Sequence, residues 1–167
     1  MIDVRANPRY RRAMEAVTPS ESLVVFYTDG SADPKRKDGS WAFVRVENDS
    51  VVSEASARVK KTDSARMEMI AVIEALQTLK TASQVLVNTD CHMLIEAMEK
   101  FVPHWKANDW RKPKTNLPIP NVDLYKILDG FVSTHTVSWR WVKAHNGNRF
   151  NERCDELCRL ARGLSTK

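Results

Sequence analysis

The chain has 167 residues, of which 43% are hydrophobic and 28% are charged, and its formal net charge is +5. This length suits one domain with a substantial core, and the composition is ordinary for a globular protein. No apolar run approaches the roughly 20 residues that span a bilayer, and the N-terminus lacks the apolar stretch of a secretory signal. We therefore expect a cytoplasmic protein without membrane contact, whose positive charge permits a polyanionic partner without requiring one.

Residues 1–20 are polar and rich in arginine, which predicts a flexible leader, with a short amphipathic helix over residues 9–17 as the alternative. Residues 21–167 are expected to form a single domain. Its apolar periodicity predicts strands at 23–28, 41–46, 51–59, 85–89 and 137–142, and helices at 64–80, 91–101, 121–132 and 151–162. This order predicts an α/β fold with a mixed five-stranded sheet, three antiparallel strands followed by parallel ones, and helices on both faces.

The three cysteines are expected to be free thiols. An odd number in a chain of this size argues against a disulfide framework. Cys154 and Cys158 lie one helical turn apart, but no second pair of ligands accompanies them, so we do not expect a zinc site.

Four carboxylates stand in or at the end of apolar runs: Asp29, Glu68, Asp90 and Asp155. Two of them follow threonine at the end of a predicted strand, the edge of an α/β sheet where sites lie. Each also has a structural alternative: a turn former, a salt bridge within the helix, or an acid that stabilises a helix N-terminus. If the fold brings the four together, their oxygen ligands suit Mg²⁺ or Mn²⁺, and two such ions form a phosphodiester-cleaving arrangement.

Residues 102–120 have a different character, because they interleave tryptophans with cations between four prolines. Such a surface can grip a sugar-phosphate backbone, although at least one tryptophan is expected to pack internally. The prolines argue against a continuous long helix there. The candidate contacts are Trp105, Lys106, Trp110, Arg111, Lys112 and Lys114.

His145 lies in a polar loop after the last predicted strand, ten residues before Asp155. Most loop histidines are exposed bystanders. Beside a metal-bound phosphate, however, this one would be placed to carry protons at neutral pH.

In order and spacing, several segments together resemble ribonuclease H of the bacterial type 1 class: residues 27–31 (Tyr-Thr-Asp-Gly-Ser), 66–69 (Arg-Met-Glu-Met), 88–90 (Asn-Thr-Asp), 121–124, 139–145 and 151–157. The resemblance runs from about residue 24 to residue 161. It implies an endonuclease that cuts the RNA strand of RNA–DNA hybrids, leaving 5′-phosphate and 3′-hydroxyl ends. It also implies that the four carboxylates hold two Mg²⁺ ions, that His145 assists proton transfer or product release, and that residues 102–120 form the DNA-gripping protrusion.

The chain departs from this family at several positions where the resemblance implies contacts with the substrate. Residues 32–40 (Ala-Asp-Pro-Lys-Arg-Lys-Asp-Gly-Ser) replace a Gly/Pro-rich turn that usually contains asparagine. Thr62 falls one residue early, with Asp63 in the usual threonine position and Ser64 after it, and His92 stands where glutamine is common. Thr62, Ser64 and His92 are therefore expected substrate contacts of altered character.

Two other functions remain open. One is a different nuclease or nucleotidyl transferase with the same metal-dependent fold. The other is a catalytically silent module that binds RNA–DNA hybrids. The protein is expected to be a monomer in each case.

Overall fold

The computed structural model describes residues 20–165, so the predicted leader and the alternative helix at residues 9–17 lie outside the described part of the chain. The strands are β1 (Ser20–Asp33), β2 (Asp38–Glu47), β3 (Ser50–Lys60), β4 (Ser83–Thr89) and β5 (Thr136–Trp141). The helices are α2 (Ser64–Leu76), α3 (His92–Glu96), the π-helical turn η3 (Ala97–Phe101), α4 (Val102–Ala107), α5 (Val122–Thr134) and α6 (Arg149–Ala161).

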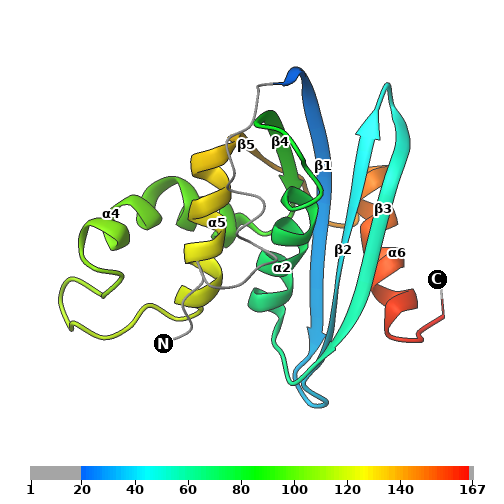
Figure 1. Ribbon diagram of the computed structural model, residues 1–167. Helices are drawn as coiled ribbons and strands as arrows, with labels where there is room; N and C mark the ends of the chain where they lie inside the picture. The colour runs from blue at the N-terminus through cyan, green and yellow to red at the C-terminus, as the bar shows by residue number, and fades with distance from the viewer. Residues whose placement is uncertain (1–19, 166–167) are drawn as a thin grey trace.

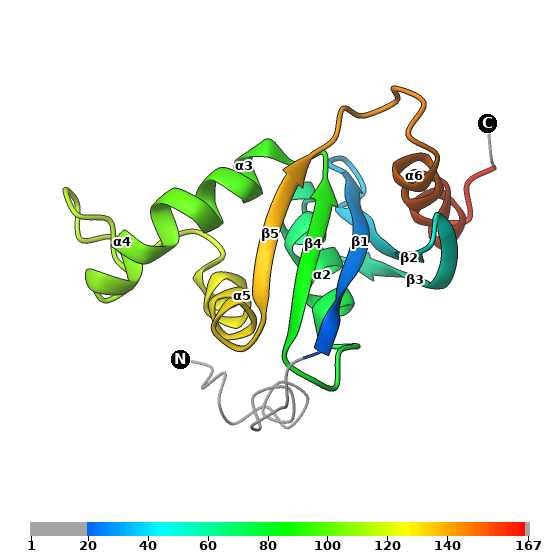
Figure 2. The ribbon, with the colours of Figure 1, turned by 90° about the horizontal axis from the view of Figure 1, so that it is seen from above.

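The five strands form one sheet in the order β3-β2-β1-β4-β5. Pairing is antiparallel between β1 and β2 and between β2 and β3, and parallel between β1 and β4 and between β4 and β5. The predicted mixed sheet is therefore confirmed. Figures 1 and 2 show α2 and α5 on one side of it and α6 on the other.

Alternating side chains of β1 fill a core on each face of the sheet, as the twofold period of a strand requires. Val24 and Phe26 belong to the larger core, which is built mainly with α2 and α5. Val25 and Tyr27 pack against the smaller core, where α6 covers β2. Because both faces are covered, β1 holds its residues rigidly at the centre of the molecule.

The ends of several elements differ from the predictions. The first strand does not end at Thr28 but continues to Asp33, because residues 29–33 pair with β2 as a hairpin. Parallel pairing with β4 does stop at Thr28, opposite Thr89. The first long helix ends at Leu76 rather than residue 80. Asn121, the residue before α5, adopts a left-handed conformation, and its side chain makes no capping hydrogen bond.

As the prolines predicted, residues 102–120 form no continuous long helix, since only Val102–Ala107 are helical. The helix expected to end at residue 101 nevertheless continues into them. α3, η3 and α4 follow one another without interruption and form a helical arm that projects from the sheet (Figures 1 and 2). Pro103 lies in the first turn of α4, directly after the π-helical turn. The wider π turn relieves the clash that a proline ring makes with the preceding turn. The other three prolines lie in the non-helical loop beyond the arm.

Among residues 20–165, no helix is both long enough and apolar enough to cross a membrane.

Candidate active site

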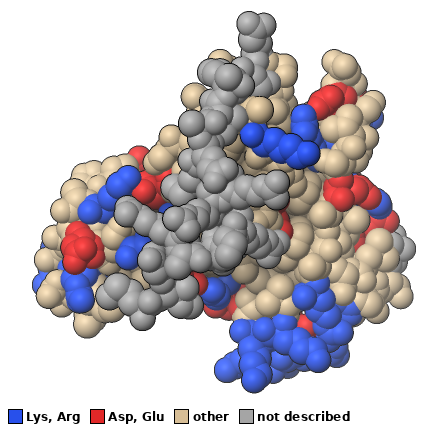
Figure 3. Space-filling model, in the orientation of Figure 1, with Lys and Arg blue, Asp and Glu red and all other residues tan. Residues whose placement is uncertain are grey.

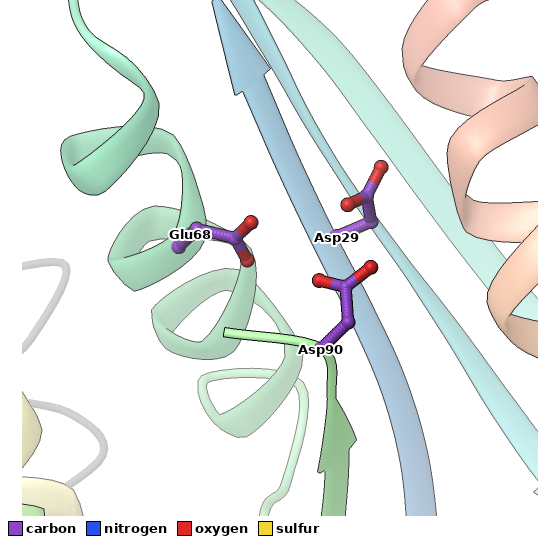
Figure 4. Close-up of side chains that lie close together, drawn as sticks. All are labelled: Asp29, Glu68 and Asp90. Atoms are coloured by element: carbon purple, nitrogen blue, oxygen red, sulfur yellow. The ribbon is translucent and has the colours of Figure 1, made fainter. Parts of the chain in front are cut away.

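Three of the four predicted carboxylates converge on one point of the structure. Asp29 comes from β1, Glu68 from α2 and Asp90 from the residue after β4, and each offers an oxygen within 4.8 Å of the others. Figure 4 shows the three side chains, which we call the acidic cluster, directed toward one another. Asp29 lies inside its strand, but one residue beyond the last pairing with β4, so β1 carries it past the end of that neighbour.

Glycine at position 30 allows α2 to approach β1 at the acidic cluster. A Cβ atom on Gly30 would lie 2.2 Å from the backbone nitrogen of Glu68 and 2.2 Å from the carbonyl carbon of Met67. No side chain fits in that space. The first turns of α2 therefore rest directly on the strand, and Glu68 is delivered beside Asp29.

The electrostatics of the cluster are strained in the absence of a counter-charge. Burial raises the pKa of Asp29 to about 7, and the charges of Asp90 and Asp155 add to that rise. Burial, with Asp29 and Asp90 contributing, raises the pKa of Glu68 well above its usual value. One oxygen of Glu68, Oε2, is buried without a hydrogen-bond partner. Within residues 20–165 no lysine, arginine or histidine forms an ion pair with any of the three acids.

Asp155 stands slightly apart from the cluster. It lies on α6, partly exposed, and its charge reaches Asp29 although its carboxylate is not among the three converging groups. The same helix face carries Asn151, four residues earlier, whose Nδ2 donates to Asp90 Oδ2 at 3.4 Å. Asn151 is buried and its Oδ1 has no partner. α6 is thus tied to the cluster through an asparagine that the sequence reasoning had missed.

Two further bonds, one to Asp90 and one to Thr89 before it, come from the last residue of β5 and the residue after it, which the sequence did not indicate. The indole Nε1 of Trp141 donates to the backbone oxygen of Asp90 at 3.2 Å, and the Val142 amide donates to Thr89 at 3.0 Å. These bonds fix the backbone that presents Asp90.

The side chains of His145 and His92 are both exposed, and neither belongs to the acidic cluster. His145 has a left-handed backbone conformation, with φ of 51°, in the loop that joins β5 to α6. His92 is the first residue of α3, two positions after Asp90.

Thr62 and Ser64 border a surface hollow of about 400 Å³ between the β1–β2 hairpin and the start of α2. Ser64 Oγ accepts a hydrogen bond from the Ala32 amide at 3.1 Å, and Thr62 is buried at the rim. Asp63, between them, caps α2 by accepting from the Arg66 amide at 2.9 Å. Lys37 and Lys61 also line the hollow.

The candidate contacts of residues 102–120 lie on α4 and the loop that follows it. Trp105 packs between Phe101 and Tyr125, at ring-centroid distances of 5.8 and 5.1 Å, so the expected internal tryptophan is found. Trp110 is also partly buried and lies beneath the Lys126 ammonium, 5.7 Å from the ring centroid.

Two of the four cations in residues 102–120 have hydrogen-bonding or ion-pair partners within the protein. Lys106 pairs with Asp129 at 2.8 Å, and Arg111 donates to the backbone oxygen of Asn116 at 2.9 Å within its own loop. Lys112 and Lys114 are exposed.

The residues of the acidic cluster fit a divalent metal. Their donors are all carboxylate oxygens, which hard cations such as Mg²⁺ prefer. The buried, unpartnered oxygen of Glu68 and the raised pKa values of Asp29 and Glu68 are what a missing positive charge produces. Asp155 is not one of these converging groups, but its charge acts on Asp29.

Comparisons with known proteins identify the family of the chain. A protein-family model for RNase H matches residues 21–162. Ribonuclease HI of Neisseria meningitidis serogroup B is 40% identical over 134 residues, covering 80% of this chain and 91% of that protein. Ribonuclease H of Francisella philomiragia subsp. philomiragia is 37% identical over 138 residues, covering 83% and 90%.

Solved structures show the same fold. LC9-RNase H1, a type 1 RNase H with the type 2 active-site motif, superposes with a TM-score of 0.73 at 25% identity, covering 86% of this chain and 74% of that one. With the family model spanning most of the chain and relatives of this identity along nearly their whole length, the chain belongs to the RNase H family.

Proposed function

We propose that this protein is an endonuclease that hydrolyses the RNA strand of RNA–DNA hybrids with divalent metal ions held by its acidic cluster. One observation carries the proposal: three carboxylates from three separate elements meet within 4.8 Å, and no cationic side chain of the described residues pairs with them. Membership of the RNase H family supports the choice of substrate.

Asp29, Glu68 and Asp90 would hold the metal, with Asp155 beside them, and we propose two Mg²⁺ ions, with Mn²⁺ as a substitute. When bound, such ions would lower the pKa of a water molecule and place positive charge beside the phosphate oxygens. The cleaved strand would carry 5′-phosphate and 3′-hydroxyl ends.

The protein's own residues set the geometry. Gly30 lets Glu68 reach Asp29, and the bonds from Asn151 and Trp141 hold Asp90 in place. Preorganised ligands avoid the cost of ordering them when substrate binds. His145, in its exposed loop, would accept or deliver a proton near the cluster or assist the departure of product.

We propose that substrate binding extends over two neighbouring regions. Thr62, Ser64 and His92 would contact the nucleic-acid strands of the hybrid next to the acidic cluster. The arm would contact the DNA backbone through Lys106, Arg111, Lys112 and Lys114. Trp105 and Trp110 would mainly support that surface, because much of each ring is used in packing. Contacts to 2′-hydroxyl groups in the minor groove would select RNA over DNA.

We further propose that residues 21–167 act as one catalytic domain and that the protein works as a monomer in the cytoplasm.

A cleavage assay on end-labelled substrates tests the function directly. We expect metal-dependent cuts in the RNA strand of a hybrid, no cuts in duplex DNA, and complete loss of activity in EDTA. Cleavage of duplex DNA at a similar rate would favour another nuclease of this fold. Binding of the hybrid without any metal-dependent cleavage would favour the silent hybrid-binding module.

A further inference from the structure

The end of the molecule that carries the β1–β2 hairpin bears a concentration of positive charge that the site described above does not use. Figure 3 shows lysine and arginine side chains gathered at the bottom of the view, where Figure 1 places the hairpin and the connection from β3 to α2. We define the hairpin patch as the cations of these two turns, namely Lys35, Arg36, Lys37, Lys60 and Lys61. All five are exposed.

The two turns are held together by backbone bonds, so the cations form one surface. The Thr62 amide donates to the Lys37 carbonyl at 3.1 Å, which joins the β3–α2 connection to the hairpin. Within the hairpin, Asp33 Oδ1 accepts from the amides of Lys35 and Arg36. The scaffold of the hairpin patch therefore does not depend on its cationic side chains.

The hairpin patch keeps a net positive charge. Three acids lie beside its five cations, namely Asp33, Asp38 and Asp63. Asp38 is already paired with a further cation, Arg58, at 2.7 Å. Asp33 has an exposed ion pair with Arg36 at 3.6 Å, which is worth little in water. Asp63 accepts a backbone amide at the start of α2. For comparison, residues 102–120 carry four cations and one acid, and Lys106 among them is paired.

Two of the lysines occupy backbone conformations that favour glycine or asparagine. Lys37 and Lys61 have φ values of 49° and 56°. The left-handed region is unfavourable for a residue with a Cβ atom. Lys37 and Lys61 therefore lower stability at these two positions. Both line the hollow that Ser64 also borders, and they place two positive charges there.

The position of the hairpin patch relates it to the acidic cluster. β1 runs from Asp29 directly to Asp33 at the base of the turn, four residues or about 13 Å along an extended strand. The arm leaves the cluster along another element, α3, in a different direction (Figure 1). A duplex lying across the cluster at about 3.4 Å per step would reach the hairpin patch four or five base pairs from the reacting phosphate.

The N-terminus of α2, between the cluster and the hairpin patch, is less able to bind phosphate. The carboxylate of Asp63 already satisfies an amide there and places a negative charge beside it. Positive charge for a nucleic-acid backbone on this side of the cluster therefore comes from the hairpin patch.

We propose that the hairpin patch is a second backbone-binding surface, which holds the phosphodiester backbone of the RNA–DNA hybrid four or five base pairs from the acidic cluster, on a path separate from that of the arm. This inference rests on the proposed function, because the hybrid is taken as the bound polyanion. It predicts that long hybrids are bound more tightly, and with steeper salt dependence, than hybrids that cover only the cluster.

The test removes two charges while keeping the turn. In Lys35→Gln/Lys37→Asn, asparagine suits the left-handed position and the backbone bonds remain. A control with the same change in net charge, Arg45→Gln/Lys80→Gln, removes two cations away from the hairpin. Arg45 lies near the other end of β2, where it pairs with Glu47, and the exposed Lys80 lies four residues beyond the end of α2. Binding of a long and a short hybrid is measured over a range of salt concentrations in EDTA, which prevents cleavage.

For the hairpin variant on the long hybrid, we expect the slope of log affinity against log salt to fall by about 1.4–1.8, at 0.7–0.9 for each lost contact. The slope should stay unchanged on the short hybrid and in the control variant on both hybrids. An unchanged slope on the long hybrid overturns the proposal. So does an equal fall on the short hybrid or in the control, since either would reflect net charge alone.

Cleavage at saturating hybrid and metal separates this inference from the proposed function. The hairpin variant should keep the turnover rate of the unmodified protein. If the unmodified protein binds the hybrid with the expected slopes but does not cut it, the function fails while the binding surface stands.

Discussion

Gly30 and Glu68 touch through their backbones: a Cβ on Gly30 would lie only 2.2 Å from the Glu68 nitrogen. This contact sets the distance between α2 and β1, and with it the distance between two acids of the cluster. A substitution at position 30 therefore tests directly whether the spacing between α2 and β1 is needed for the site.

Replacing Gly30 with alanine should therefore displace α2 rather than add a harmless methyl group. Overpacking of this kind typically costs about 1–3 kcal/mol of unfolding free energy. We expect a loss in that range by urea denaturation, together with a large fall in metal-dependent cleavage. Gly147→Ala is the comparison, because that glycine has φ of 77° but nothing within 4 Å of its Cβ position. A smaller stability loss at position 30 than at position 147 would contradict the tight contact.

Asp29 should destabilise the metal-free protein at neutral pH. Its pKa is raised from 3.8 to about 7 on folding, so the folded state keeps a proton that the unfolded state has lost. Stability therefore falls as pH rises between these values, and the penalty is complete above about pH 7. In EDTA, Asp29→Asn should be more stable than the unmodified protein at pH 8, by roughly 1–4 kcal/mol, and not at pH 4.

The same variant should lose cleavage and should no longer be stabilised by added Mg²⁺, because a ligand is missing. Glu99→Gln removes an exposed acid from the arm and serves as the charge control. A gain in stability of equal size at both pH values would show that the effect of Asp29→Asn does not come from its ionisation.

Asn151 is expected to act as a positioning residue through its bond to Asp90. Removal of such a partner typically costs 10–100-fold in metal affinity or activity. We expect Asn151→Ala to raise the Mg²⁺ concentration for half-maximal cleavage by about that factor. Leu157→Ala, a buried position on the same helix, should lower stability without moving the metal titration. Equal metal titrations for Asn151→Ala and the unmodified protein would refute the positioning role.

The arm should contribute to binding more than to chemistry. With Arg111, Lys112 and Lys114 changed to alanine, KM for the hybrid should rise while kcat changes little, and the salt slope should fall by about 0.7–0.9 per contact. Lys106→Ala alone should have a smaller effect, because that ammonium is already paired with Asp129. If kcat drops and KM does not change, the arm has a role other than gripping the backbone.

His145 should assist turnover without being essential, since it lies in an exposed loop outside the acidic cluster. General acid–base assistance is worth about 10²–10⁴-fold, and a role in product release would be worth less. We expect His145→Ala to retain metal-dependent cleavage and hybrid affinity. A defect seen only in steady state indicates product release, whereas an equal defect in single turnover indicates proton transfer. Unchanged rates in both would make His145 a bystander.

Local sequence pattern was enough to predict the strands, the mixed character of the sheet and the three acids that converge. Alternating apolar residues predict a strand from local sequence alone. An acid at the end of such an apolar run, as at Asp90, indicates a candidate site residue. The motifs around Asp29, Glu68 and Asp90 likewise pointed to the RNase H family before any contact between them was known.

Other features depended on partners distant in the chain and were decided by the tertiary structure. Asp29 lies within a strand because β2 pairs with the residues after it. The need for glycine at position 30 comes from a helix that begins 34 residues later, and the bond from Asn151 crosses 61 residues to Asp90. The two turns of the hairpin patch are joined by the backbone bond between Thr62 and Lys37 and by the pairing of Asp38 with Lys60. Sequence periodicity records which face of an element is apolar, whereas only packing determines which elements meet and how closely.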